Sequence, residues 1–277
     1  MARFGDDQRL LGIVTVPELA RANAPACLLM NAGVVHRIGP HRINVKIAQS
    51  LAESGIASVR IDLSGLGDSK AALGAVHSGE QTVRDLQDAM AYLDETLGIR
   101  RFVVFGLCSG SVHGYRLALV DDRVVGLMMF DGYLFPTLKT HLWRRWRRFR
   151  TLSWRSLARK PLQWLARPAQ VDQSGERSDD VHLGIPTRSQ FAQAMETLTR
   201  RGTSVYLYFS ASFIEKYNYR GQLRDTFGNA PFMKRIRYDY ETDVDHTVTS
   251  LHAQRKVVAS VRDWIQSIAE ASTGSST

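Results

Sequence analysis

The decisive stretch of this sequence reads Phe102-Val103-Val104-Phe105-Gly106-Leu107-Cys108-Ser109-Gly110. Its pattern is G-x-C-x-G, because Gly106 and Gly110 stand two residues before and two residues after Cys108. A side chain displayed on a sharp strand-to-helix turn brings neighbouring backbone so close that both of these flanking positions must be small. The pattern therefore predicts that Cys108 is the nucleophile of a strand–turn–helix elbow.

The neighbouring Ser109 does not meet the same steric requirement, because Leu107 and Ser111 stand two residues from it. We expect the backbone N–H of Ser109 to serve instead as a donor in an oxyanion hole. A different interpretation of Cys108 also stays open at this stage, since an unpaired cysteine is most often a small buried hydrophobic residue.

Length and composition predict one enzyme-sized domain, because 277 residues with 44% hydrophobic content can bury a single large core. No apolar stretch is long enough to span a bilayer, and residues 1–8 are polar. The two cysteines, Cys27 and Cys108, do not suggest a disulfide framework. We therefore expect a cytoplasmic protein in which the thiol of Cys108 stays reduced.

Apolar strand-like runs alternate with helical patterns along the chain, which predicts an α/β fold with a mostly parallel central sheet and helices on both faces. Strands are expected at 10–16, 26–31, 58–63, 102–107, 124–130, 204–209 and 235–240, and helices at 42–54, 82–97, 111–119 and 251–268. The glycine turn at 64–68 is too short for a dinucleotide fingerprint. We expect no cofactor and no metal.

Between residues 135 and 201 this alternation stops, which predicts a cap inserted into a core made of residues 1–134 and 202–277. From 139 to 167 the sequence has ten Lys and Arg, no Asp or Glu, and four tryptophans, at positions Trp143, Trp146, Trp154 and Trp164. Such a stretch suits an acidic partner such as an acyl carrier protein, or weak association with an anionic membrane; nucleic acid is not expected. Alternatively, the aromatic rings pack on the sheet and the arginines face water.

A thiol nucleophile needs a base, and His246 is the histidine that we expect to supply it. It follows the last strand and precedes the last helix, in the loop from which a base can reach the elbow. The other histidines considered stand elsewhere, with His113 in the helix after the elbow, His182 in the expected cap and His252 early in the final helix.

The acid that orients this histidine is less well defined by the sequence. Its usual place is the loop after the penultimate strand, where Glu215 is the only carboxylate, although it stands a residue or two late. Asp131, directly after the preceding strand, is the alternative. Asp243 and Asp245 are too near His246 in sequence to turn back onto its ring easily. We expect Glu215, with Asp131 as the second choice.

The second oxyanion donor should come from the loop at 31–42, after the first central strand. Gly33 permits close approach of the backbone, and the N–H of Val34 is the natural donor. Gly33, His36 and Arg37 are candidates for substrate binding, and His36 and Arg37 add positive charge at the mouth of the site. They could equally pair with the helix that follows.

Taken together, these segments resemble the α/β-hydrolase superfamily. The loop with Asn31-Ala32-Gly33 and His36-Arg37-Ile38-Gly39-Pro40, and the turn Asp62-Leu63-Ser64-Gly65-Leu66-Gly67-Asp68-Ser69, are similar to exosortase-associated hydrolases and related hydrolases of biosynthetic gene clusters. The cysteine at the elbow is also similar to that of dienelactone hydrolase.

The resemblance implies acyl transfer through a covalent intermediate. Cys108 would attack an ester or thioester carbonyl, His246 would carry the proton, and Val34 and Ser109 would hold the oxyanion. Because an acyl thioester stays reactive, the acyl group could pass to water or to another nucleophile, as in a thioesterase, an acyltransferase or a cyclase. The competing hypothesis is a binding protein that has kept the fold and lost turnover.

Overall fold

The computed structural model describes residues 1–72, 78–133, 135–143, 185–212 and 217–274. In these ranges one eight-stranded sheet forms the centre, in the order β1-β2-β4-β3-β5-β6-β7-β8. The strands are β1 Ala2–Phe4, β2 Leu10–Thr15, β3 Ala26–Leu29, β4 Ser58–Asp62, β5 Phe102–Leu107, β6 Val124–Phe130, β7 Ser204–Ser210 and β8 Ile236–Glu241. Strands β3 to β8 are parallel, whereas β1 and β2 run antiparallel to their neighbours.

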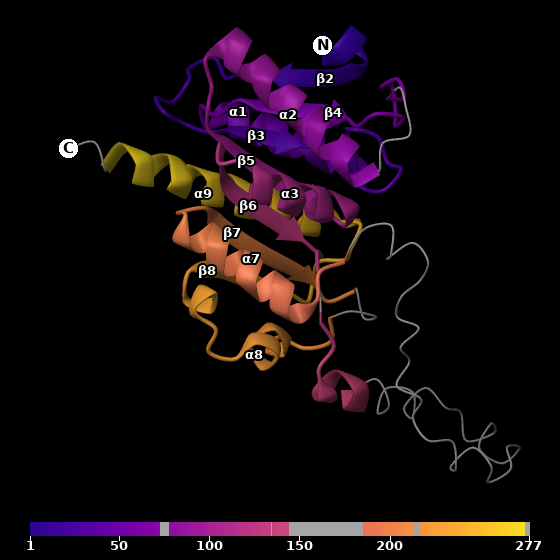
Figure 1. Ribbon diagram of the computed structural model, residues 1–277, viewed down its shortest axis with the longest axis vertical. Helices are drawn as coiled ribbons and strands as arrows, with labels where there is room; N and C mark the ends of the chain where they lie inside the picture. The colour runs from indigo at the N-terminus through magenta and orange to yellow at the C-terminus, as the bar shows by residue number, and fades with distance from the viewer. Residues whose placement is uncertain (73–77, 134, 144–184, 213–216, 275–277) are drawn as a thin grey trace, which may run out of the picture.

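Helices cover both faces of this sheet (Figure 1). They are α1 Ile43–Glu53, α2 Ser78–Leu97, α3 Ser109–Val120, α7 Arg188–Arg200, α8 Gln222–Phe227 and α9 Leu251–Gly274, with short 3₁₀ turns at Asp6–Gln8, Pro40–Arg42 and Pro231–Lys234. α1 and α9 pack on one face, and α2, α3 and α7 pack on the other. The α/β-hydrolase architecture with a mostly parallel sheet, which the sequence predicts, is thereby confirmed.

The apolar runs form strands where they do because β5 and its neighbours are covered on both faces. All six residues of β5 are buried between β3 and β6, as expected for a continuous apolar run at the centre of a parallel sheet. On the outside, α9 turns Val257, Val261 and Ile265 inward at helical spacing, and these side chains share a core cluster with Ile47 of α1.

Helix α7 lies within the range 135–201 that the sequence analysis assigns to a cap. It buries Phe191, Met195 and Leu198 in the same core cluster as α2 and α3, so it is part of the helical layer that covers the sheet. Most of the basic, tryptophan-rich segment lies outside the described residues. The cap therefore stays a prediction.

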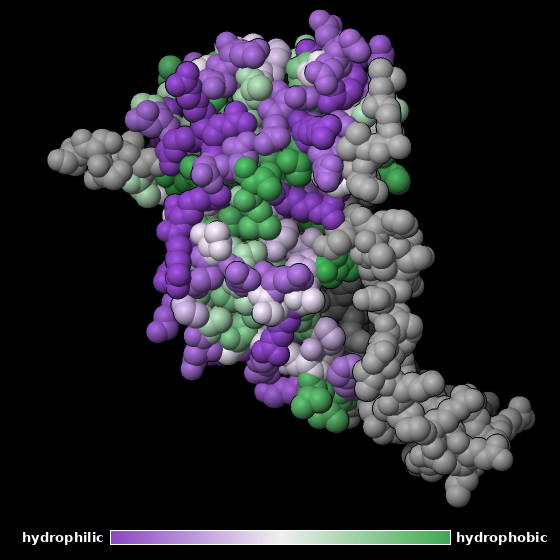
Figure 2. Space-filling view, viewed as in Figure 1, coloured by the Kyte–Doolittle hydropathy of each residue, from purple (hydrophilic) through white to green (hydrophobic). Residues whose placement is uncertain are grey.

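On the face that carries α2, α3 and α7, the surface over α2 is largely hydrophilic, and apolar surface is exposed below it, toward α3 and α7 (Figure 2). Near the end of α3, Val120 has 64% of its surface exposed. Among the described residues, no helix is both long enough and apolar enough to cross a membrane.

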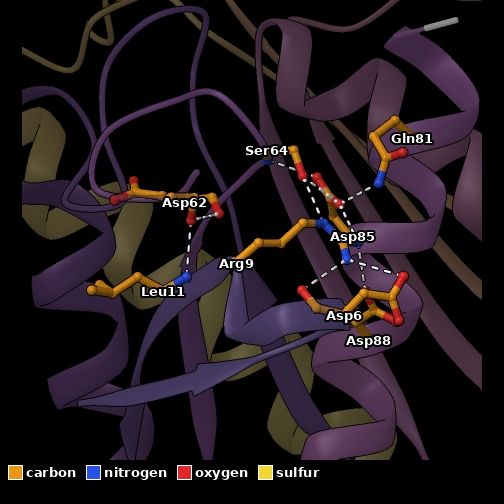
Figure 3. Close-up of polar contacts among 9 residues, drawn as sticks. Asp6, Arg9, Leu11, Asp62, Ser64, Gln81, Asp85 and Asp88 are labelled. Carbon is orange, nitrogen blue, oxygen red and sulfur yellow. Dashed lines mark hydrogen bonds and ion pairs between the residues drawn. The ribbon is translucent and has the colours of Figure 1, made fainter. Parts of the chain in front are cut away.

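A buried charge cluster fixes the glycine turn after β4 against α2 and the start of β2 (Figure 3). The guanidinium of Arg9 donates to Asp85 Oδ1 at 3.2 Å and to Asp88 Oδ2 at 2.9 Å. Asp85 also accepts from the N–H and the hydroxyl of Ser64, at 2.7 and 2.8 Å. Since the Asp85 side chain is only 1% exposed, it needs all of these donors to offset its desolvation.

We predict that Asp85→Ala lowers the free energy of unfolding by about 3 kcal/mol, because it leaves the buried Arg9 charge and the Ser64 N–H without this acceptor. The measurement is urea denaturation at pH 7. Asp263→Ala is the matched control, since Asp263 makes an exposed pair with Arg262 and should cost less than about 1 kcal/mol. Equal losses in the two variants would contradict a structural role for the cluster.

Candidate active site

Cys108 lies at the turn between β5 and α3, with φ 56° and ψ −117°. This conformation is unfavourable for a residue with a side chain and persists only where its surroundings impose it. A Cβ at Gly106 would meet the carbonyl oxygen of Gly110 at 2.2 Å, so this position accepts only glycine. The Cys108 N–H donates to the carbonyl of Phe130 at 3.0 Å, which fixes the turn to the end of β6.

His246 contacts both Cys108 and Asp131. Its Nδ1 lies 2.8 Å from Oδ2 of Asp131, the residue that directly follows β6. The Cys108 side chain forms a hydrogen bond with the same imidazole. Because Asp131 occupies Nδ1, the nitrogen that remains for Cys108 is Nε2. The three side chains thus stand in the order thiol, imidazole and carboxylate.

The carboxylate of Asp131 is fully buried and held by further donors from the end of β7. Its Oδ1 accepts from the Ser210 N–H at 2.7 Å, and its Oδ2 accepts from the Ser210 hydroxyl at 2.6 Å. The Ser212 hydroxyl in turn accepts from the His246 N–H at 2.6 Å. Parallel strands end at one edge of the sheet, which is why residues after β6, β7 and β8 meet here.

These contacts change the protonation of His246. Its hydrogen bond to Asp131, followed by that to Cys108, raises the pKa of His246 to about 9, although burial of the ring opposes the rise. At neutral pH the imidazole is therefore mainly an imidazolium, which favours a thiolate beside it.

Glu215, the first choice of the sequence analysis for the acid, lies outside the described residues. The alternative, Asp131, is the carboxylate on the imidazole. Among the nearer acids, Asp243 pairs with His252 at 2.8 Å, and Asp245 accepts from the N–H of Thr249 at 2.8 Å. The participation of Ser210 was not foreseen, although a polar residue that ends an apolar parallel strand could have indicated it.

The loop after β3 is joined to the elbow by one hydrogen bond. The Gly33 N–H donates to the Ser109 hydroxyl at 2.7 Å. Gly33 has a φ of 57°, and a Cβ there would meet nothing within 4 Å, so the position favours glycine for its backbone conformation, with open space around it. Val34, the expected oxyanion donor, is 86% exposed on the turn between Ala32 and Val35. His36 is also exposed.

Asp62, at the end of β4, fixes the shape of this loop. It accepts from the backbone N–H of Arg37 at 2.6 Å and from the Asn31 side chain at 3.1 Å, and it forms an ion pair with the Arg37 guanidinium. The same guanidinium contacts Asp68 at 2.6 Å. Two carboxylates therefore already engage the charge of Arg37, which the sequence analysis assigns to substrate binding. Asp62 and Asn31 are positioning residues that the sequence analysis did not identify.

The described residues contain no group of three or more His, Cys, Asp or Glu arranged to hold a metal ion. The imidazole of His246 and the loop after β3 are instead held by the buried carboxylates of Asp131 and Asp62. Such a site suits covalent chemistry at a carbonyl group.

The sheet order, the elbow after β5 and the histidine loop after β8 define an α/β hydrolase. A family model described as serine aminopeptidase, S33, matches residues 33–207. Because this span exceeds half of the 277 residues, the chain belongs to that family. The family's description refers to serine, whereas Cys108 stands at the centre of this elbow.

Solved structures with the same fold include several hydrolases. Est1E from Butyrivibrio proteoclasticus, with bound ferulic acid, has a TM-score of 0.60 at 15% identity, covering 93% of this chain and 94% of that one. An esterase from Thermogutta terrifontis has a TM-score of 0.57 at 15% identity, with 94% of each chain covered. Proline iminopeptidase from Mycobacterium smegmatis has a TM-score of 0.55 at 17% identity, covering 95% and 96%. At these identities the likeness concerns the fold alone. The comparison with curated proteins found no match.

We predict that the His246 imidazole titrates near pH 9. Asp131→Asn should move the midpoint down toward the ordinary value of about 6.5, because the neutral amide no longer favours the imidazolium. Two-dimensional NMR of the histidine rings measures both values. Asp243→Asn is the control, since Asp243 contacts His252, and it should leave the His246 midpoint where it is. Equal midpoints in wild type and Asp131→Asn would contradict the pairing.

The same shift makes a prediction about stability. Because the folded-state pKa of His246 is raised, its contribution is fully present below about pH 6.5 and is lost as the pH rises through about 9. Urea denaturation between pH 6 and 10 should therefore show the advantage of wild type over His246→Gln shrinking in this window. An advantage that grows with pH would contradict the assignment.

Proposed function

We propose that the protein is a cysteine-dependent acyl-transfer enzyme that cleaves ester or thioester bonds through an acyl-Cys108 intermediate. The observation that carries the proposal is the position of His246, with Nδ1 on the buried Asp131 at 2.8 Å and the Cys108 thiol hydrogen-bonded to the imidazole. A positioned nucleophile, a base and an acid that orients the base are the parts that covalent acyl transfer needs.

The reaction runs in two steps in which His246 moves one proton each time. At rest the proton is held on Nε2 of His246 and Cys108 is a thiolate, whose sulfur forms a bond to the substrate carbonyl carbon. When the tetrahedral intermediate collapses, the bond to the leaving alcohol or thiol breaks, and His246 protonates that group. A water molecule then gives its proton to His246 and attacks the acyl-Cys108 thioester, and cleavage of the carbon–sulfur bond releases the acid and restores the thiolate–imidazolium pair.

Developing charge on the carbonyl oxygen needs donors near the elbow. The first-turn N–H groups of a helix have no intrahelical acceptor, so the Ser109 N–H at the start of α3 is suited to this task. The N–H of Val34 is the second donor that we propose. The Ser109 hydroxyl acts as a positioning group, because its bond to the Gly33 N–H sets the distance between the loop and the elbow.

The proposal also covers the molecule that accepts the acyl group and the partner that delivers it. An acyl group on sulfur remains reactive toward amines and alcohols, so an acceptor other than water is compatible with the site. Presentation of the acyl group by an acidic carrier protein is proposed from the basic stretch at 139–167, most of which lies outside the described residues.

We expect intact-protein mass spectrometry to reveal one acyl adduct per chain after brief exposure to a panel of acyl thioesters and activated esters. The adduct should be absent in Cys108→Ala, because the sulfur atom carries it. Cys27→Ala is the matched control, since Cys27 is fully buried in β3, and it should keep the adduct. Aminoacyl anilides in the same panel test the peptidase chemistry that the family's description suggests. No adduct and no turnover on any compound would favour a binding protein instead.

Ser109→Ala should reduce the rate of acyl-enzyme formation by roughly tenfold while changing KM little, because it frees the oxyanion loop without removing a substrate contact. Stopped-flow kinetics with the best donor from the panel measures this split. Ser54→Ala, at the far end of α1, provides a matched control in which the rate should not change. If Ser54→Ala formed the acyl-enzyme equally slowly, the loss of rate in Ser109→Ala would reflect a general loss of folding and would contradict the positioning role.

A further inference from the structure

Three side chains near the elbow each have a buried polar atom without a hydrogen-bond partner among the described residues, although His113 and Arg116 as whole residues are only partly buried. They are His113 through Nδ1, Arg116 through Nη1 and Tyr133 through its hydroxyl. Buried polar atoms are almost always paired, so several unpaired ones in one place need an explanation. Tyr133 is only 7% exposed and follows Asp131 by two residues, which places it at the carboxyl edge of the sheet beside the candidate site.

These three groups form one cluster. The charge of Arg116 acts on both of the others: burial and then this charge lower the pKa of His113 to about 4, and burial raises the pKa of Tyr133 while the Arg116 charge opposes part of the rise. His113 is therefore neutral at pH 7. Aromatic rings close the cluster on one side, because Tyr133 packs edge-on against Tyr115 with centroids 5.1 Å apart.

Two members of the cluster lie on the same helix as Ser109, the residue that follows Cys108. Ser109, His113 and Arg116 follow one another at i, i+4 and i+7 of α3, so they lie on one face of the helix. His113 lies roughly 6 Å and Arg116 roughly 10 Å beyond Ser109 along the axis. Side chains on a helix lean toward its N-terminus, which brings the long Arg116 side chain back in the direction of Cys108.

The cation of Arg116 also has an electrostatically unfavourable neighbour. A Cβ on Gly79 would meet Nη1 of Arg116 at 2.1 Å, so the guanidinium packs against the first turn of α2. The N-terminal end of a helix carries partial positive charge and favours anions. Arg116 makes no ion pair within the described residues. A partly buried cation with an unpaired Nη1, an unpaired hydroxyl and a helix N-terminus together supply the positive charge and the donors that an anion would bind.

We propose that this cluster binds a carboxylate at the far end of the acyl chain, so that the enzyme prefers acyl donors derived from dicarboxylic acids. The Arg116 guanidinium would pair with the carboxylate, and the hydroxyl of Tyr133 would donate to it. The inference rests on the proposed function, because Ser109 connects this helix face to the acyl-Cys108 intermediate.

The test compares adipyl and hexanoyl thioesters of N-acetylcysteamine, which differ mainly in the terminal carboxylate. We expect the ratio of kcat/KM for adipyl over hexanoyl to be at least tenfold in wild type and to fall at least tenfold in Arg116→Gln. Tyr133→Phe, which removes only the hydroxyl, should lower the same ratio. Arg255→Gln, an exposed position on α9 on the opposite face of the sheet, should leave it unchanged. A ratio near one in wild type, or the same ratio in Arg116→Gln, would overturn the proposal.

A second measurement does not depend on turnover. In Cys108→Ala, adipate should shift the His113 ring resonances, because an anion beside the imidazole changes the electric field at the ring, and the shift should be lost when Arg116→Gln is added. Inorganic phosphate is titrated as the competing anion, and a response to phosphate without one to adipate would contradict a carboxylate site. If wild type forms no acyl adduct but adipate still shifts His113, the proposed function fails while the anion site stands.

Discussion

The site depends on one buried carboxylate. Asp131 has no exposed side-chain surface, yet the N–H and hydroxyl of Ser210 and the Nδ1 of His246 all reach it. A buried charge without such donors would cost several kcal/mol, at about the level of a domain's whole stability margin. The ends of β6 and β7 and the histidine loop must therefore stay together for the fold to remain favourable, and that requirement holds the His246 ring toward Cys108.

The same principle fixes the opposite side of the site. Asp62 ends β4, and it is satisfied by the backbone of Arg37, the Arg37 guanidinium and the Asn31 side chain. Its burial therefore determines the path of the loop that faces the elbow. In both cases the end of a parallel strand places a carboxylate at the edge of the sheet where Cys108 and His246 lie, and residues at the end of the neighbouring strand supply donors.

The fold was predictable because its central strands β3, β5 and β6 are short, almost wholly apolar runs and the strands are separated by segments with helical periodicity. Each expected strand is present within two residues of its expected limits, whereas α2 and α9 extend farther than expected. The antiparallel β1 was not foreseen, since three residues carry too little pattern. At the site, the order of the elements predicted that Cys108, in the turn after β5, and His246, in the loop after β8, lie close together.

The carboxylate that contacts His246 was harder to predict, because sequence order favoured Glu215, which lies outside the described residues, over Asp131. Which of several carboxylates reaches a histidine depends on how strand ends meet across the sheet, and this is not encoded in local spacing. Arg37 presents a similar case. Its charge suggested substrate binding, but only the three-dimensional arrangement reveals the two carboxylates that pair with it.

In the mechanism that we propose, a cysteine stands at the elbow of a family whose description refers to serine, and this gives the buried carboxylate a further role. With a thiol, an imidazolium held by Asp131 can stabilise a thiolate before any substrate arrives.

The most direct test is the rate of alkylation of Cys108 by iodoacetamide from pH 5 to 9 in wild type and in His246→Ala. The account predicts fast alkylation already at pH 6 to 7 in wild type, and a rate in His246→Ala that rises only toward pH 8 to 9. Identical profiles in the two proteins would contradict a functional pair.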